Sequence, residues 1–181
     1  MRSIAWPAAG QAMLRMDPGM AFGTGNHATT RACLEYIAES EPSQSFLDVG
    51  CGSGILAVAA QLLGFGNVSG FDLDADAVQV AKETAAENGV EIPFFRGDLS
   101  GHLQGNPEIP SADFVAANVL GPVLIRFADR IATLVNKGGT IILSGILDEL
   151  YPEVKAKYES LGFTERSSKL IGEWRTGLFV N

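Results

Sequence analysis

The stretch that most constrains this chain is residues 46–57, Phe-Leu-Asp-Val-Gly-Cys-Gly-Ser-Gly-Ile-Leu-Ala. An apolar run, three alternating glycines and helix-compatible residues predict a strand, a tight turn and a helix start. The glycines can adopt positive φ and let a ligand approach the backbone, and the helix start offers unpaired N–H groups. The stretch therefore predicts a nucleotide-like binding site. Many loops contain a glycine triplet, so the neighbouring residues must show whether this one belongs to a binding site.

Length and composition indicate one ordinary globular domain. The chain has 181 residues, 46% of them hydrophobic, which suffices for one sizeable core. No apolar run approaches the roughly 20 residues of a membrane span, and the first residues lack a signal-peptide pattern, so we expect a cytoplasmic protein. Cys33 and Cys51 fall in a predicted helix and in the glycine turn, which favours reduced thiols. Two cysteines and two separated histidines give no metal-ligand pattern.

The formal net charge of −8 argues against a general nucleic-acid binder, because affinity for phosphate backbones comes from clustered Lys and Arg. A basic protein or a cationic small molecule is a better electrostatic match. An acidic composition can equally serve solubility alone. Nothing in the sequence indicates a membrane partner or sets the oligomeric state.

The chain divides into a short arm, residues 1–16, and one domain, residues 17–181. The arm has no strong hydrophobic period, so we expect it to be irregular. A loop rich in glycine and threonine then leads into a helix with one apolar face, which carries Thr30, Leu34, Ile37 and Ala38. Asn26 or Thr29 can cap that helix, and the loop before it can close over a ligand.

From residue 45 onward, strand and helix patterns alternate. Strands are expected over residues 45–49, 68–71, 93–96, 114–117 and 140–144, and helices over residues 55–63, 75–88, 123–135 and 153–161. Asp74 can cap the second of these helices and Gly89 can end it. Residues 137–139 form a predicted turn, and residues 164–168 and 173–179 a terminal β pair. The alternation predicts an α/β fold with a parallel sheet and helices on both faces.

Candidate polar groups follow four of the predicted strands: the glycine turn, Asp72, Asp98 and Asn118. Ligands of open parallel sheets bind beyond the carboxyl ends of the strands. Asp72 lies twenty residues beyond Gly52, the spacing at which an acidic side chain accepts hydrogen bonds from a ribose diol. Any one carboxylate is explained equally well as a helix cap or a solvated loop end. Together, the four groups predict a nucleoside site.

The glycine spacing narrows the choice among nucleoside ligands. Dinucleotide sites use Gly-X-Gly-X-X-Gly, whereas this turn has Gly-X-Gly-X-Gly with Asp48 two residues before it. That form resembles the first motif of class I S-adenosylmethionine-dependent methyltransferases. The resemblance implies a Rossmann-like fold with a mostly parallel seven-stranded sheet and an antiparallel C-terminal strand. It also implies that Asp48 orients the amino-acid end of the cofactor and that Asp98 and Leu99 meet the adenine. A nicotinamide or flavin oxidoreductase is the competing class, disfavoured by the glycine spacing.

Four stretches resemble the PrmA family of bacterial enzymes that methylate a large-subunit ribosomal protein. Residues 17–30, 47–57, 117–120 and 143–147 match that family in the same order, so the resemblance covers roughly residues 14–181. It implies S-adenosyl-L-methionine as cofactor. The implied cofactor contacts, besides Asp48, Asp98 and Leu99, are Phe22, Gly23, Thr24, Thr30, Gly50, Gly52, Gly54, Asp72, Leu73 and Asn118.

The resemblance implies transfer of a methyl group to a lysine or N-terminal amine of a basic protein, such as a ribosomal protein. Asn118 is the predicted catalytic residue, which accepts a hydrogen bond from the amine and aims it. Residues 119–121, Val-Leu-Gly, stand where many amino-methylating enzymes have Pro-Pro-Tyr. His27 is the nearest candidate base, although a role in shaping its loop fits equally well.

One departure from the family leaves the acceptor open. Members carry a substrate-recognition domain before this fold, and only some sixteen residues precede the match here, so we expect that domain to be absent from this chain. Another protein lysine, a small-molecule acceptor and a non-catalytic cofactor-binding module therefore remain as alternatives.

Overall fold

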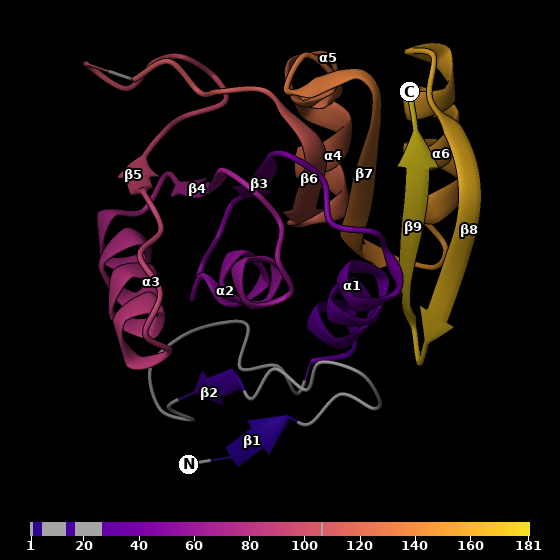
Figure 1. Cartoon of the computed structure of the whole chain (residues 1–181). Helices are drawn as coiled ribbons and strands as arrows, with labels where there is room; N and C mark the ends of the chain where they lie inside the picture. The colour runs from indigo at the N-terminus through magenta and orange to yellow at the C-terminus, as the bar shows by residue number, and fades with distance from the viewer. Residues whose placement is uncertain (1, 5–13, 17–26, 106) are drawn as a thin grey trace.

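The computed structural model describes residues 2–4, 14–16, 27–105 and 107–181, and Figure 1 shows how the elements are arranged. Seven strands form one sheet in the spatial order β5-β4-β3-β6-β7-β9-β8. Strands β5, β4, β3, β6 and β7 are parallel, whereas β9 is antiparallel to both of its neighbours. The strands are β3 (Phe46–Val49), β4 (Val68–Asp72), β5 (Phe94–Arg96), β6 (Ala112–Asn118), β7 (Val135–Leu147), β8 (Thr164–Ile171) and β9 (Trp174–Val180). The predicted sheet, with its antiparallel C-terminal strand, is confirmed.

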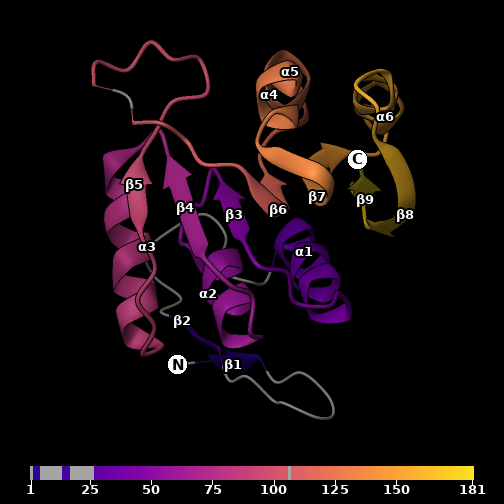
Figure 2. The ribbon, with the colours of Figure 1, turned by 45° about the horizontal axis from the view of Figure 1, so that its top comes forward.

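Helices cover both faces of the sheet, as predicted. One face carries α1 (Ala28–Glu39), α2 (Ile55–Leu62) and α3 (Ala75–Glu87), and the other carries α4 (Gly121–Arg126), α5 (Ala128–Ala132) and α6 (Tyr151–Ser160). Figure 2 shows these two layers on opposite sides of the strands. Each layer encloses its own cluster of buried apolar side chains.

Strand β3 lies in the interior of the sheet, between β4 and β6, and all four of its side chains are buried. Phe46 packs under α1 and α2, together with Phe65 and Phe114. The centroids of these three rings lie 5.3 to 5.5 Å apart. Leu47, the next residue, enters the cluster on the other face. Successive strand side chains point to opposite faces, so a strand covered on both sides needs an apolar run, which this sequence provides.

The predicted ends of α3 are confirmed. The Asp74 Oδ1 atom accepts a hydrogen bond from the backbone N–H of Asp76 at 2.9 Å, which caps the helix start. Gly89, just beyond the helix, has a φ of +70°. Such left-handed conformations favour glycine, so this position ends the helix where the sequence indicates.

The start of α1 differs from the prediction. Its N-cap is His27, and Thr29 is a buried residue within the helix, so the proposed Thr29 cap is wrong. Asn26 lies outside the described residues. Thr30, Leu34 and Ile37 are buried as expected, but Ala38 is exposed, because the helix is then leaving the sheet.

The helix predicted over residues 123–135 is instead two short helices followed by a strand. Pro122 lies in the first turn of α4, which starts two residues early, and a break at Phe127 separates α4 from α5. Val135 pairs with Ala112 in the sheet, so residues 137–139 lie within β7 instead of preceding it. Helical periodicity continues across this segment, but pairing with β6 decides its end.

The arm also departs from expectation, because β1 (Arg2–Ile4) and β2 (Leu14–Met16) form a two-stranded antiparallel sheet. Strands of three residues are too short to show a period of two in the sequence. Among the described helices, none has the length and apolar content needed to cross a bilayer.

Candidate functional site

The candidate site lies at the carboxyl ends of the parallel strands: the glycine turn follows β3, Asp72 and Asn118 are the last residues of β4 and β6, and Asp98 lies two residues beyond β5. Val49 is in register with Phe71 on one side and with Ala117 on the other. The next residues along the three strands, Gly50, Asp72 and Asn118, therefore lie at one level of the sheet edge. The sequence placed four polar groups at strand ends, and the topology collects them along one edge.

The glycine turn requires its glycines. Gly50, Gly52 and Gly54 have φ values of +67°, +51° and +73°. A Cβ at Gly50 would lie 2.5 Å from the Cγ1 atom of Val119, and a Cβ at Gly54 would lie 2.8 Å from that of Ala81. The turn therefore needs glycine both for its backbone conformation and for the side chains packed against it.

Asp72 meets the glycine turn directly. Its Oδ2 atom accepts the backbone N–H of Gly52 at 3.0 Å, and its Oδ1 atom accepts that of Asp74 at 3.0 Å. The predicted pair, twenty residues apart, is thus in contact. The carboxylate is fixed at the sheet edge, and each oxygen keeps a further lone pair for a ligand. Leu73, the next residue, is 56% exposed. A fixed carboxylate beside an open apolar side chain fits the ribose and base of a nucleoside.

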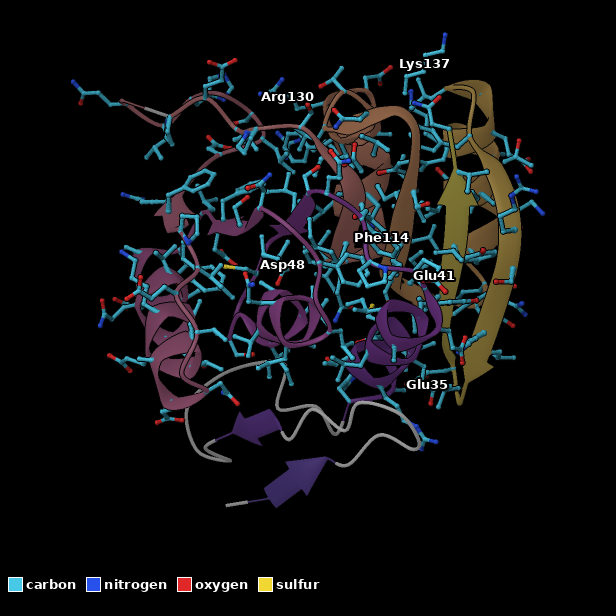
Figure 3. The ribbon with its side chains drawn as sticks, viewed as in Figure 1. Glu35, Glu41, Asp48, Phe114, Arg130 and Lys137 are labelled. Carbon is cyan, nitrogen blue, oxygen red and sulfur yellow. The ribbon has the colours of Figure 1, made fainter. Side chains whose placement is uncertain are left out.

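Asp48 is buried beneath the turn, next to the start of α2 (Figure 3). Its Oδ2 atom accepts the backbone N–H of Ala57 at 3.2 Å. The pKa of its carboxyl group is raised to about 7, mainly by burial; the Ala57 bond lowers the pKa and the nearby charge of Asp72 raises it. In the described structure Asp48 holds α2 to β3, and its cofactor contact stays a prediction.

Asp98 interacts with its own loop. It accepts hydrogen bonds from the hydroxyl and the backbone N–H of Ser100, which lower the pKa of its carboxyl group. Asp98 and Leu99 are both half-buried at the end of β5. The structure therefore places them on the predicted edge, and their contact with an adenine stays a prediction.

Asn118 and Thr30 are brought together across 88 residues of sequence. The Asn118 Nδ2 atom donates to the Thr30 Oγ1 atom at 3.4 Å, which joins the end of β6 to the first turn of α1. Both residues were predicted to contact the cofactor. This contact leaves the Asn118 Oδ1 atom as the acceptor of the amide.

A second set of hydroxyl contacts, which the sequence did not predict, secures α1 against the sheet. Ser144, opposite Asn118 in β7, donates to the Thr29 carbonyl at 3.3 Å and lies 2.6 Å from the Thr176 hydroxyl. The side chains of Ser144 and Thr176 are both buried. The signal was a serine at the end of an apolar predicted strand, residues 140–144.

The remaining predicted residues are the loop residues Phe22, Gly23 and Thr24 and the candidate base His27. Phe22, Gly23 and Thr24 lie outside the described residues. His27 Nδ1 is 2.8 Å from the Thr29 hydroxyl, and its ring packs edge-on against Trp174 at 5.1 Å. These contacts give His27 a role in shaping the start of α1, and a role as base stays a prediction.

The strand order, the glycine turn and the acidic residue after β4 together define a Rossmann-like class I methyltransferase fold. Comparison with known proteins identifies the family. The model of the family described as Ribosomal protein L11 methyltransferase (PrmA) matches residues 3–180, so the chain belongs to that family.

Relatives in several bacteria support this membership. The chain is 46% identical over 154 residues to the ribosomal protein L11 methyltransferase of Azotobacter vinelandii, covering 84% of this chain and 51% of that protein. It is 43% identical over 176 residues to that of Geobacter sulfurreducens, covering 97% of this chain and 56% of that protein. The chain thus spans about half the length of the curated relatives it matches.

Solved structures agree with the fold. The structure of ribosomal protein L11 methylase from Lactobacillus delbrueckii subsp. bulgaricus matches with a TM-score of 0.81 and 30% identity, over 92% of this chain and 83% of that chain. The precorrin-6y C5,15-methyltransferase of Geobacter metallireducens GS-15 matches with a TM-score of 0.71 over 97% of this chain and 98% of that chain. Its identity is 12%, so it shows the fold alone.

Proposed function

We propose that the chain transfers a methyl group from S-adenosyl-L-methionine to an amine of a protein, in the cytoplasm. Family membership supports this proposal. The observation that carries it is the convergence of the fixed Asp72 carboxylate and the Asn118–Thr30 pair at the carboxyl edge of one sheet. The relatives are named for methylation of ribosomal protein L11, and we propose L11 as the acceptor.

The proposed mechanism is mainly one of positioning. When bound, S-adenosylmethionine supplies an electrophilic methyl group on a sulfonium. Asp72 holds the ribose hydroxyls, and Leu73 packs against the base. The Oδ1 atom of Asn118, whose Nδ2 atom donates to Thr30, accepts a hydrogen bond from the amine and fixes the direction of its lone pair. Fixing two reactants in this way removes a large part of the activation barrier to methyl transfer.

The acceptor must be neutral to attack. A lysine amine has a reference pKa of about 10.4 and an N-terminal amine about 8, so only a minor fraction of lysine is reactive at neutral pH. The proposed mechanism assigns no side chain as base. We therefore expect transfer to accelerate as pH rises toward the pKa of the amine.

Calorimetric titration tests the cofactor. The chain is expected to bind S-adenosylmethionine and to give no heat with NAD. Asp72→Ala should weaken the binding of S-adenosylmethionine by about 1–3 kcal/mol, because the substitution removes charge-assisted hydrogen bonds to the ribose. Asp129→Ala, which removes an exposed carboxylate paired with Lys157 on the far side of the sheet, is the matched control and should bind normally. NAD binding without S-adenosylmethionine binding would refute the proposal.

Methyl transfer separates this proposal from its alternatives. Labelled S-adenosylmethionine should label purified L11. Label in another protein of a lysate, with none in L11, would instead favour a different protein lysine. Cofactor binding with no transfer to any acceptor would favour a non-catalytic binding module.

A further inference from the structure

One large apolar side chain faces solvent two residues beyond Asn118. Leu120 is 63% exposed, more than Leu73 or Leu170, the other exposed large apolar residues of the described chain. It is the N-cap of α4 and makes no side-chain capping bond. Serine, threonine, asparagine and aspartate stabilise a helix at this position, and leucine does not. Leu120 therefore sits where neither solvation nor helix stability favours it.

The segment that carries Leu120 is fixed on three sides. Val119 packs against Gly50, and its backbone passes so close to Gly145 that a Cβ there would collide with it. A Cβ at Gly121 would lie 2.6 Å from the Cδ2 atom of Leu150. The carbonyl of Leu120 accepts the first hydrogen bonds of α4, from Val123 at 2.8 Å and from Leu124 at 3.2 Å. Leu120 is therefore held at a set position relative to Asn118.

An acidic residue lies in the turn that packs next to this segment. A Cβ at Gly121 would lie 2.6 Å from the Cδ2 atom of Leu150, so the turn of residues 148–150, which carries Glu149, lies beside the start of α4. Glu149 is exposed and forms no ion pair with any described residue, whereas the adjacent Asp148 is held by Arg175 at 2.6 Å. The start of α4 and this neighbouring turn thus carry one exposed apolar side chain and one exposed carboxylate that has no ion pair among the described residues.

We propose that Leu120 and Glu149 are specificity-determining contacts for the segment of the protein acceptor that presents a lysine to Asn118. This inference rests on the proposed function. The four-carbon stem of the lysine packs on Leu120 while its amine reaches Asn118, and a second cation of the same segment pairs with Glu149. A basic acceptor segment also complements the overall charge of the chain, whose formal net charge is −8.

Leu120→Ser tests the apolar contact, with L11 as acceptor and S-adenosylmethionine saturating. The KM for L11 should rise roughly tenfold, equivalent to about 1.4 kcal/mol, with kcat changed less than twofold. The Kd for S-adenosylmethionine should stay as in wild type. Serine is a good N-cap, so the melting temperature should be unchanged or higher, which excludes misfolding as the cause. Leu170→Ser, an exposed leucine on β8 at the sheet margin, is the matched control and should match wild type.

Glu149→Gln tests the charge contact. The KM for L11 should rise about threefold at low salt, and this difference should shrink at high salt because the lost pair is exposed. Glu153→Gln removes another exposed carboxylate, in the first turn of α6, and should leave KM unchanged.

The outcomes distinguish this inference from the proposed function. If wild type methylates L11 and the KM of Leu120→Ser stays within twofold of wild type, the inference is overturned and the proposed function stands. Weaker cofactor binding by Leu120→Ser would also overturn it, because Leu120 would then contact the cofactor. If wild type binds S-adenosylmethionine but transfers nothing to L11, the proposed acceptor is wrong and the inference falls with it.

Discussion

At the scale of single residues, Asp48 is a buried carboxyl group whose ionisation is costly. Burial raises the pKa of its carboxyl group from 3.8 to about 7. Between these values the folded chain keeps a proton that the unfolded chain has lost, so stability falls as pH rises through this window. Above pH 7 the full cost applies, roughly 4 kcal/mol at about 1.4 kcal/mol per unit. The bond from Ala57 does not remove that cost, because it is one hydrogen bond to a buried charge.

Asp48→Asn should therefore stabilise the fold most at high pH. The amide oxygen can still accept the Ala57 N–H, and no charge is buried. Urea denaturation at pH 5 and pH 8 measures the difference in the free energy of unfolding between variant and wild type. We expect that difference to be larger at pH 8. An equal difference at both values would show that Asp48 does not titrate in this window.

At the scale of elements, the boundaries that depend on local chemistry were predictable. Asp74 and Gly89 bound α3 through a side-chain cap and a positive φ, and both are readable from the sequence. The segment after β6 was not predictable in this way, because Val135 belongs to β7 through its pairing with Ala112. Periodicity describes one element at a time, whereas strand pairing depends on a partner distant in sequence.

Asp74→Ala tests the cap of α3. Losing the bond to Asp76 should cost about 1 kcal/mol of stability and lower the melting temperature by about 2–4 °C. Thermal unfolding followed by circular dichroism measures the shift. Glu87→Ala, at the other end of the same helix, should leave the melting temperature nearly unchanged. Equal shifts in the two variants would mean that the cap does not stabilise α3.

At the scale of the whole molecule, the sheet edge assembles the site from distant segments. The Gly52–Asp72 contact was predictable, because one strand–helix–strand unit fixes that spacing. Asn118 was predictable from its place after a predicted strand, whereas Thr30, 88 residues away, was assigned to the same site only through family resemblance. The contacts of Ser144 with α1 and with Thr176 were missed, because they depend on how α1 and β9 pack beside β7. The alternation of strand and helix patterns predicted the helix layers on the two faces of the sheet, whereas tertiary packing decides which side chains come into contact.

Asn118→Ala tests the central claim most directly, namely that this edge both binds S-adenosylmethionine and aims an amine at it. Two quantities are measured on one preparation: the Kd for S-adenosylmethionine by calorimetry and the rate of labelled methyl transfer to L11 at saturating cofactor. We predict a fall in transfer of at least a hundredfold, about 2.7 kcal/mol, with Kd changed less than threefold. Asn88→Ala, at the far end of α3, should alter neither. Transfer by Asn118→Ala at the wild-type rate, or a loss of binding as large as the loss of transfer, would contradict the proposed role of Asn118.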